Sequence, residues 1–127
     1  MDTRRVQRNI WEVILMNGHD LFMELQDKQK LLEKALKELG RRGRAKADSE
    51  QKYRIALAQE ILIKRDKGFP ATLISDLCRG EKHIAKLKFE RDVADTMYTA
   101  ALEAIMSYKL TIRVISDQID REWRRND

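Results

Sequence analysis

The sequence has few residues that interrupt regular structure. Its 127 residues include one proline and five glycines, so few positions favour a turn or a helix end. Aromatic residues make up 6% and charged residues 37%, which suits extended helices with much solvated surface better than a compact globule. The single cysteine, Cys78, excludes an intrachain disulfide and favours a reducing cytoplasm. No apolar run approaches the roughly 20 residues of a membrane span, and no signal peptide is evident.

Residue groups that carry catalysis or bind metal are also missing. His19 and His83 lie far apart in the sequence, and neither has a partner at a spacing typical of metal ligands or of a catalytic triad. Cys78 has no accompanying base. The glycines of Gly40-Arg-Arg-Gly43 do not match a phosphate-binding loop. We therefore expect no enzyme activity, no cofactor and no metal site.

The last third of the chain carries an apolar ladder with alternating steps of three and four residues. This spacing is the a/d seam of a coiled coil, and it predicts one long helix whose stripe lies against another helix. Arg91 is its only charged member. The ladder consists of Ile84, Leu87, Arg91, Ala94, Tyr98, Ala101, Ile105, Tyr108, Ile112, Ile115 and Ile119.

Residues that favour the start or the end of a helix divide the chain into four parts. Residues 1–19 contain an amphipathic helix, and a second helix, capped by Asp20, is expected over residues 20–67. Gly68 and Pro70 end that helix, and the connection over 68–80 contains a short helix. The ladder helix spans 81–124. We therefore predict an all-α fold, a long antiparallel helical hairpin.

Pairing two helices of equal length predicts a charged break in the middle of the seam. The expected register places Glu50 near Tyr98, Arg54 near Ala94, and Arg91 near Leu57. One interpretation is that these polar seam residues fix the register and the partner, with Glu50 in a structural role. The other is an anion site in which Arg54 and Arg91 hold a phosphate while Tyr98 stacks on a base.

The net charge of +5 comes from the first half of the chain. Residues 1–67 hold sixteen Lys/Arg and eleven Asp/Glu, whereas 68–127 hold ten of each. Such an excess attracts phosphates, although a charge run is often only a solvated helix face. The candidate ligand-binding residues in this basic cluster are Arg41, Arg42, Arg44 and Lys46.

A second apolar stripe lies outside the predicted seam of the last helix. Leu102, Met106, Leu110 and Val114 follow one another at steps of four. An outward stripe exposes apolar area unless another helix covers it, and a two-helix hairpin has a thin core. We therefore expect homo-oligomerisation through this stripe. The alternative is coverage by the chain's own first helix.

Four segments of the sequence resemble a known protein family. They are Gly68-Phe-Pro-Ala-Thr-Leu-Ile-Ser-Asp-Leu-Cys-Arg-Gly80, Lys88-Phe-Glu-Arg-Asp-Val-Ala-Asp95, and Tyr108-Lys-Leu-Thr-Ile-Arg113 with Gln118-Ile-Asp-Arg-Glu-Trp123. Together they are similar to small, uncharacterised helical proteins of phages and prophages of Gram-positive bacteria, encoded in early gene regions. The resemblance covers residues 40–124 and implies a protein that acts in the host cytoplasm by binding a partner.

The leading functional hypothesis is a non-enzymatic, homo-oligomeric phage protein that binds a nucleotide-type anion between helices and sequesters a host defence signal. The first alternative is a nucleic-acid-binding accessory of phage recombination or replication, which would use the basic first half. The second alternative is a helical protein–protein interaction module that acts on a host factor through the outward stripe of the last helix.

Overall fold

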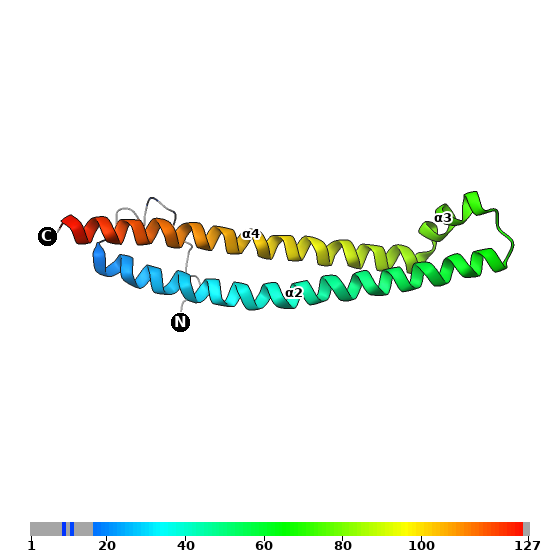
Figure 1. The fold of residues 1–127 in the computed structure, drawn as a ribbon, viewed down its shortest axis with the longest axis horizontal. Helices are drawn as coiled ribbons and strands as arrows, with labels where there is room; N and C mark the ends of the chain where they lie inside the picture. The colour runs from blue at the N-terminus through cyan, green and yellow to red at the C-terminus, as the bar shows by residue number, and fades with distance from the viewer. Residues whose placement is uncertain (1–8, 10, 12–16, 126–127) are drawn as a thin grey trace. The chain divides into compact units, whose positions relative to one another are not determined.

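The computed structural model describes residues 9, 11 and 17–125 and contains three helices over this range (Figure 1). They are α2 (Gly18–Asp66), α3 (Ala71–Gly80) and α4 (Lys82–Arg125), and the described residues form no strand. The all-α prediction is confirmed. The helix predicted within residues 1–19 falls almost entirely outside the described residues. In the described part of the chain, no helix combines the length and the apolar character that crossing a lipid bilayer requires.

The start of α2 is capped by Asn17, not by Asp20 as the sequence suggested. The Asn17 side-chain oxygen accepts a hydrogen bond from the backbone N–H of Asp20 at 3.0 Å. Its carbonyl accepts from the backbone N–H of Leu21 at 2.9 Å. Asn17 thus satisfies amides of the first turn, and Asp20 lies inside that turn, where a negative charge is favourable.

The end of α2 follows the sequence prediction closely. The backbone N–H of Phe69 donates to the carbonyl of Lys64 at 3.2 Å, and that of Gly68 donates to Arg65 at 3.0 Å. This pair of bonds is the Schellman motif, and it requires a left-handed residue, which Gly68 supplies with a φ of 79°. Pro70 then precedes α3 and prevents α2 from continuing.

The described chain divides into two units. The central unit comprises Glu38–Leu102, and the terminal unit comprises the described residues before Glu38 and after Leu102. In the terminal unit, the first part of α2 packs on the last part of α4 through the fully buried Leu21 and Ile115, with Leu25 and Ile119 beside them. The core of the central unit is equally small, and its buried apolar residues are Ile74, Cys78, Ile84 and Ala101.

All eleven ladder residues of α4 are buried or half-buried, as the heptad pattern predicted. The inward-facing residues of α2 were harder to predict. Leu36 and Ala47 belong to the apolar pattern of α2, yet both are exposed. Polar residues take several of the inward positions instead, and they are Lys28, Arg42, Lys46, Ser49, Tyr53, Glu60 and Lys64. The inner face of α2 is therefore much more polar than that of α4.

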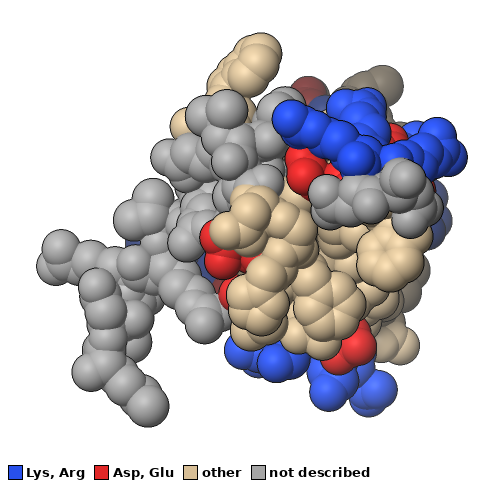
Figure 2. Space-filling model, turned by 90° about the vertical axis from the view of Figure 1, so that its left-hand side faces the viewer, with Lys and Arg blue, Asp and Glu red and all other residues tan. Residues whose placement is uncertain are grey.

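The end of the terminal unit at which α2 begins and α4 ends is shown in Figure 2. Basic side chains lie on two sides of a patch of uncharged ones, with a few acidic groups between them. Phe22, Met23 and Trp123 are exposed large apolar residues of this unit. The surface of the terminal unit thus combines charge with exposed apolar area.

Candidate functional site

The two helices of the central unit pair in a register that differs from the predicted one by one heptad. Glu50 faces Arg91, at 3.5 Å between Oε2 and Nε, and not Tyr98. Lys46 faces Asp95, at 3.0 Å between Nζ and Oδ1. The predicted neighbours of Glu50, Arg54 and Arg91 were therefore wrong. A seven-residue shift leaves a heptad pattern unchanged, so the apolar ladder could not reveal the error.

A surface pocket of about 600 Å³ lies at this polar break in the seam. Of the predicted site residues, it brings together Lys46, Glu50, Arg91 and Tyr98. Its lining residues are Gly43, Lys46, Ala47, Glu50, Arg91, Asp92, Asp95 and Tyr98. A Cβ atom built on Gly43 would lie 3.4 Å from the Tyr98 ring, so this glycine allows the ring to approach the α2 backbone closely.

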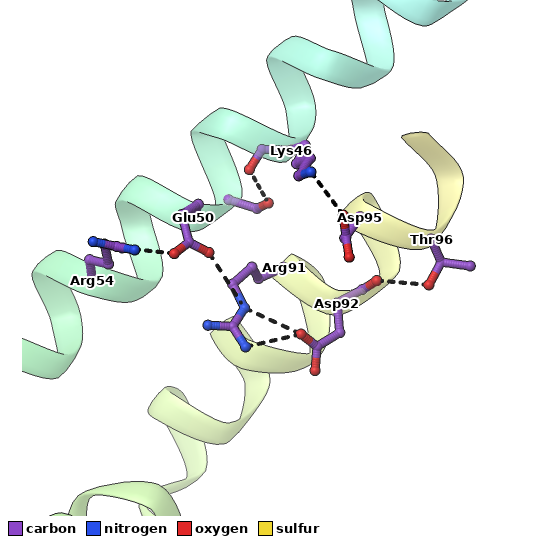
Figure 3. Close-up of polar contacts among 8 residues, drawn as sticks. Lys46, Glu50, Arg54, Arg91, Asp92, Asp95 and Thr96 are labelled. Atoms are coloured by element: carbon purple, nitrogen blue, oxygen red, sulfur yellow. Dashed lines mark hydrogen bonds and ion pairs between the residues drawn. The ribbon is translucent and has the colours of Figure 1, made fainter. Parts of the chain in front are cut away.

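Both cations of the pocket are engaged by neighbouring side chains (Figure 3). Besides Glu50, Arg91 contacts Asp92, with its Nε and Nη2 donating to Oδ1 at 3.2 and 3.1 Å. The guanidinium of Arg91 also lies 4.5 Å from the ring centre of Tyr53. Lys46 bonds Asp95 and lies 4.9 Å from the ring centre of Tyr98. Each cation thus has at least one carboxylate and one aromatic ring as partners.

These contacts form a layer with approximate two-fold symmetry. α2 supplies a cation, an acid four residues later, and a tyrosine three residues after that: Lys46, Glu50 and Tyr53. α4 repeats the spacing with Arg91, Asp95 and Tyr98, and Ala-Leu follows at the same distance in both helices. Each cation meets the acid and the tyrosine of the other helix. Sequence analysis missed Tyr53 and Asp95, although this repeat would have identified both.

The remaining predicted ligand-binding residues lie outside the pocket lining. Arg54 donates to Glu50 at 2.7 Å, as expected from their spacing, but its side chain is 77% exposed. Arg41 and Arg42 both pair with Glu38, and Arg42 also donates to the backbone carbonyl of Met97 at 2.9 Å. Arg44 is exposed and is the one residue of the basic cluster without an ion pair among the described residues. Most of the cluster is therefore neutralised locally.

The charge of the pocket does not suit a free anion. Its lining carries three carboxylates, from Glu50, Asp92 and Asp95, and two cations, from Lys46 and Arg91. A phosphate would have to displace a carboxylate from each cation and would then lie beside the displaced groups. The geometry instead resembles a polar layer that specifies how two helices align.

A second polar cluster joins the end of α2 to the start of α4. Lys64 is buried and bonds Glu81 at 2.6 Å and Glu60 at 3.4 Å. The other oxygen of Glu60 lies 3.5 Å from Nε2 of the exposed His83. The ammonium of Lys64 also lies 5.4 Å from the ring centre of Phe69. These contacts hold the chain reversal in place.

The ionisation of this second cluster follows from its contacts. The hydrogen bond to Glu81 is the main cause that raises the pKa of Lys64 above its ordinary value of 10.5. The same bond lowers the pKa of Glu81 below 4.5, with attraction to Lys64 as the next cause. Both groups are therefore charged over a wide range around neutral pH.

α3 presents a surface that the sequence analysis did not identify. Its residues Ile74 and Cys78 are buried, whereas Leu73 and Leu77, one turn apart on the adjacent face, are 51% and 38% exposed. Phe69, four residues before Leu73, is also exposed. We call these three residues the α3 ridge. The sequence signal was available, because apolar residues occur in two adjacent pairs along a ten-residue helix.

Unpaired cations surround the α3 ridge in the sequence. Residues 65–88 contain six Lys/Arg and three Asp/Glu. Among the described residues, five of these cations are exposed and form no ion pair: Arg65, Lys67, Lys82, Lys86 and Lys88. One of the three acids, Glu81, is held by Lys64. Five unpaired cations of the central unit thus lie within residues 65–88, whereas both cations that line the pocket are paired.

Comparison with known proteins gives no match to a protein-family model, a curated protein or a solved structure. The resemblance to phage proteins stays a prediction. In the part of the chain that the structure describes, no group of three or more His, Cys, Asp or Glu side chains has an arrangement that would hold a metal ion.

Proposed function

We propose that this protein is a non-enzymatic helical interaction module, and that the α3 end of its central unit binds an acidic, amphipathic helix of a partner protein. The observation that carries the proposal is the exposed α3 ridge of Phe69, Leu73 and Leu77, which belongs to a stretch of chain, residues 65–88, that also carries exposed cations without ion pairs. An apolar ridge favours leucine-like side chains, and the free cations favour carboxylates at the rim of the same contact.

A nucleotide or a nucleic acid accounts for fewer of these features. Phosphates would use the five free cations of residues 65–88, but they would leave the α3 ridge in water. The unpaired cations do favour nucleic acid as the second candidate at this surface. The nucleotide pocket at Arg91 has less support, since each of its cations already has a carboxylate partner.

The expected contribution of the ridge follows from its exposure. Burying a whole leucine side chain contributes roughly 1.5–3 kcal/mol. Leu73 and Leu77 are about half and a third exposed, so covering both contributes roughly 1.5–2 kcal/mol in total. Replacing both with serine should therefore weaken binding roughly 10- to 30-fold.

Fluorescence anisotropy with a labelled helical peptide tests the proposal. The peptide has leucines one turn apart and glutamates elsewhere, and matched peptides carry glutamine or lysine in place of glutamate. We expect the acidic peptide to bind most tightly. Leu73→Ser/Leu77→Ser and Lys82→Glu/Lys86→Glu should each weaken it at least tenfold. Arg41→Glu/Arg44→Glu makes the same charge change on α2 and should have little effect.

Two results would overturn the proposal. Equal binding of the three peptides, or no effect of the leucine substitutions, would show that the ridge is not the contact. A duplex oligonucleotide that binds with a steep salt dependence, unaffected by Leu73→Ser/Leu77→Ser, would favour the nucleic-acid alternative.

A further inference from the structure

The outward face of α4 in the terminal unit carries a palindromic pattern of side chains. Glu103, Met106, Leu110 and Arg113 follow one another at steps of three, four and three, so all four lie on one side of the helix. Met106 and Leu110 are 63% and 56% exposed. Read in the opposite direction, the pattern is the same except that the two charges exchange places.

The charges at the ends of this pattern are available for a partner. Glu103 and Arg113 are both exposed, and neither forms an ion pair among the described residues. Many other charged residues of α2 and α4 do have partners, among them Asp95, Asp92 and Glu122. This face of α4 thus presents an exposed apolar centre between two unpaired charges of opposite sign.

We propose that this face joins two copies of the chain as an antiparallel pair. In that arrangement Met106 of each copy lies on Leu110 of the other, and Glu103 of each copy lies beside Arg113 of the other. The two ion pairs stand about 15 Å apart along the helix and flank the apolar contact. A parallel pair would instead place like charges opposite each other at both positions.

The neighbouring residues are compatible with the same pairing. Leu102, at the edge of the central unit, and Val114 lie four residues outside Met106 and Leu110 on α4. Leu102 is exposed and Val114 is half-buried. In the antiparallel arrangement, Leu102 of each copy lies opposite Val114 of the other. The contact involves only a few helical turns, so the pair belongs to the weak, concentration-dependent class of interfaces.

A charge-exchange experiment on the full chain tests this pairing. Analytical ultracentrifugation should show the 15.0 kDa chain forming a dimer as its concentration rises to about 500 μM, in the range of weak association. Glu103→Arg and Arg113→Glu each replace two attractive contacts with two repulsive ones, so each variant should dimerise at least tenfold more weakly. An equimolar mixture of the two variants should dimerise like the native chain, because every contact in the mixed pair is again complementary.

Two further variants make the result decisive. Glu103→Arg/Arg113→Glu restores complementarity within one chain and should dimerise normally. Leu110→Asp should abolish the dimer while the circular dichroism spectrum stays helical. A monomeric native chain at the highest concentration would overturn the proposal. So would single variants that dimerise as well as the native chain, a mixture that stays monomeric, or a dimer that survives Leu110→Asp.

Discussion

Reversing the charge of Lys46 probes the contact that places α2 against α4 in the central unit. Lys46 bonds Asp95 at 3.0 Å and lies over the Tyr98 ring at 4.9 Å. Both charged side chains are about half-exposed, so the ion pair contributes roughly 0.5 kcal/mol and the ring contact a similar amount. Lys46→Glu removes both contacts and adds a repulsion of about the same size between the new carboxylate and Asp95. The substitution should therefore lower the free energy of unfolding by about 1.5 kcal/mol. The melting temperature should fall by roughly 6 °C.

The double variant isolates the contact between the helices. Lys46→Glu/Asp95→Lys restores an ion pair, so its free energy of unfolding should exceed the additive expectation by about 1 kcal/mol. Urea unfolding of the four proteins of the cycle measures this coupling. Lys52 and Asp48 serve as a control pair, because they lie four residues apart on α2 and their side chains are 3.0 Å apart. Their coupling does not depend on how α2 pairs with α4. Coupling in the control but none between residues 46 and 95 would refute the register described here.

Three other substitutions have expected outcomes that thermal or urea unfolding can check. Gly40→Ala should stabilise the protein by about 0.8–1 kcal/mol, since nothing lies within 4 Å of the new methyl group. Gly43→Ala should stabilise it less, because its methyl group would lie 3.4 Å from the Tyr98 ring. Equal stabilisation by the two substitutions would contradict the close approach of Tyr98 to Gly43. Glu81→Gln should destabilise the protein at neutral pH. The difference in free energy of unfolding from the native protein should disappear as the pH falls through the lowered pKa of Glu81. A difference that stays constant down to about pH 2 would contradict this. Ile115→Ala should cost about 2–4 kcal/mol because the side chain is fully buried, and a cost below about 1 kcal/mol would show that the small core of the terminal unit is not formed.

The sequence allowed the helices to be predicted because their boundaries depend on local chemistry. Gly68 and Pro70 end α2 through interactions within a few neighbouring residues, and the Schellman hydrogen bonds at Gly68 and Phe69 confirm this predicted end. The ladder of α4 was equally readable, since apolar residues dominate its inner face. Asp20 was predicted to cap α2, but the side chain of Asn17, three residues earlier, caps this helix instead.

The pairing of the helices could not be predicted from apolar periodicity. A heptad seam is unchanged by a shift of seven residues, so only specific polar contacts distinguish one register from the next. Those contacts involve Lys46 and Tyr53 on α2, at inward positions that an apolar pattern ignores. The repeated spacing of Arg91, Asp95 and Tyr98 was the one sequence signal that could have supplied the register.

The location of the free positive charge likewise depends on tertiary contacts. Counting residues directs attention to Arg41, Arg42 and Lys46, where basic side chains are dense in the sequence. The fold pairs these residues with Glu38 and Asp95. Five cations without an ion pair instead flank α3 in the sequence, with Arg65 and Lys67 before it and Lys82, Lys86 and Lys88 after it. A charge count therefore located the basic residues but not those available for binding.

One measurement tests most directly whether recognition uses the α3 surface or the polar pocket. Two-dimensional NMR of the isotope-labelled full chain, titrated separately with the acidic amphipathic peptide and with a nucleoside triphosphate, reports which amides each ligand affects. We expect the peptide to shift the amides of residues 65–88, and the triphosphate to leave the amides of Gly43–Glu50 and Arg91–Tyr98 unchanged. Saturable shifts at Gly43–Glu50 and Arg91–Tyr98 with the triphosphate, together with none over residues 65–88 with the peptide, would contradict this account.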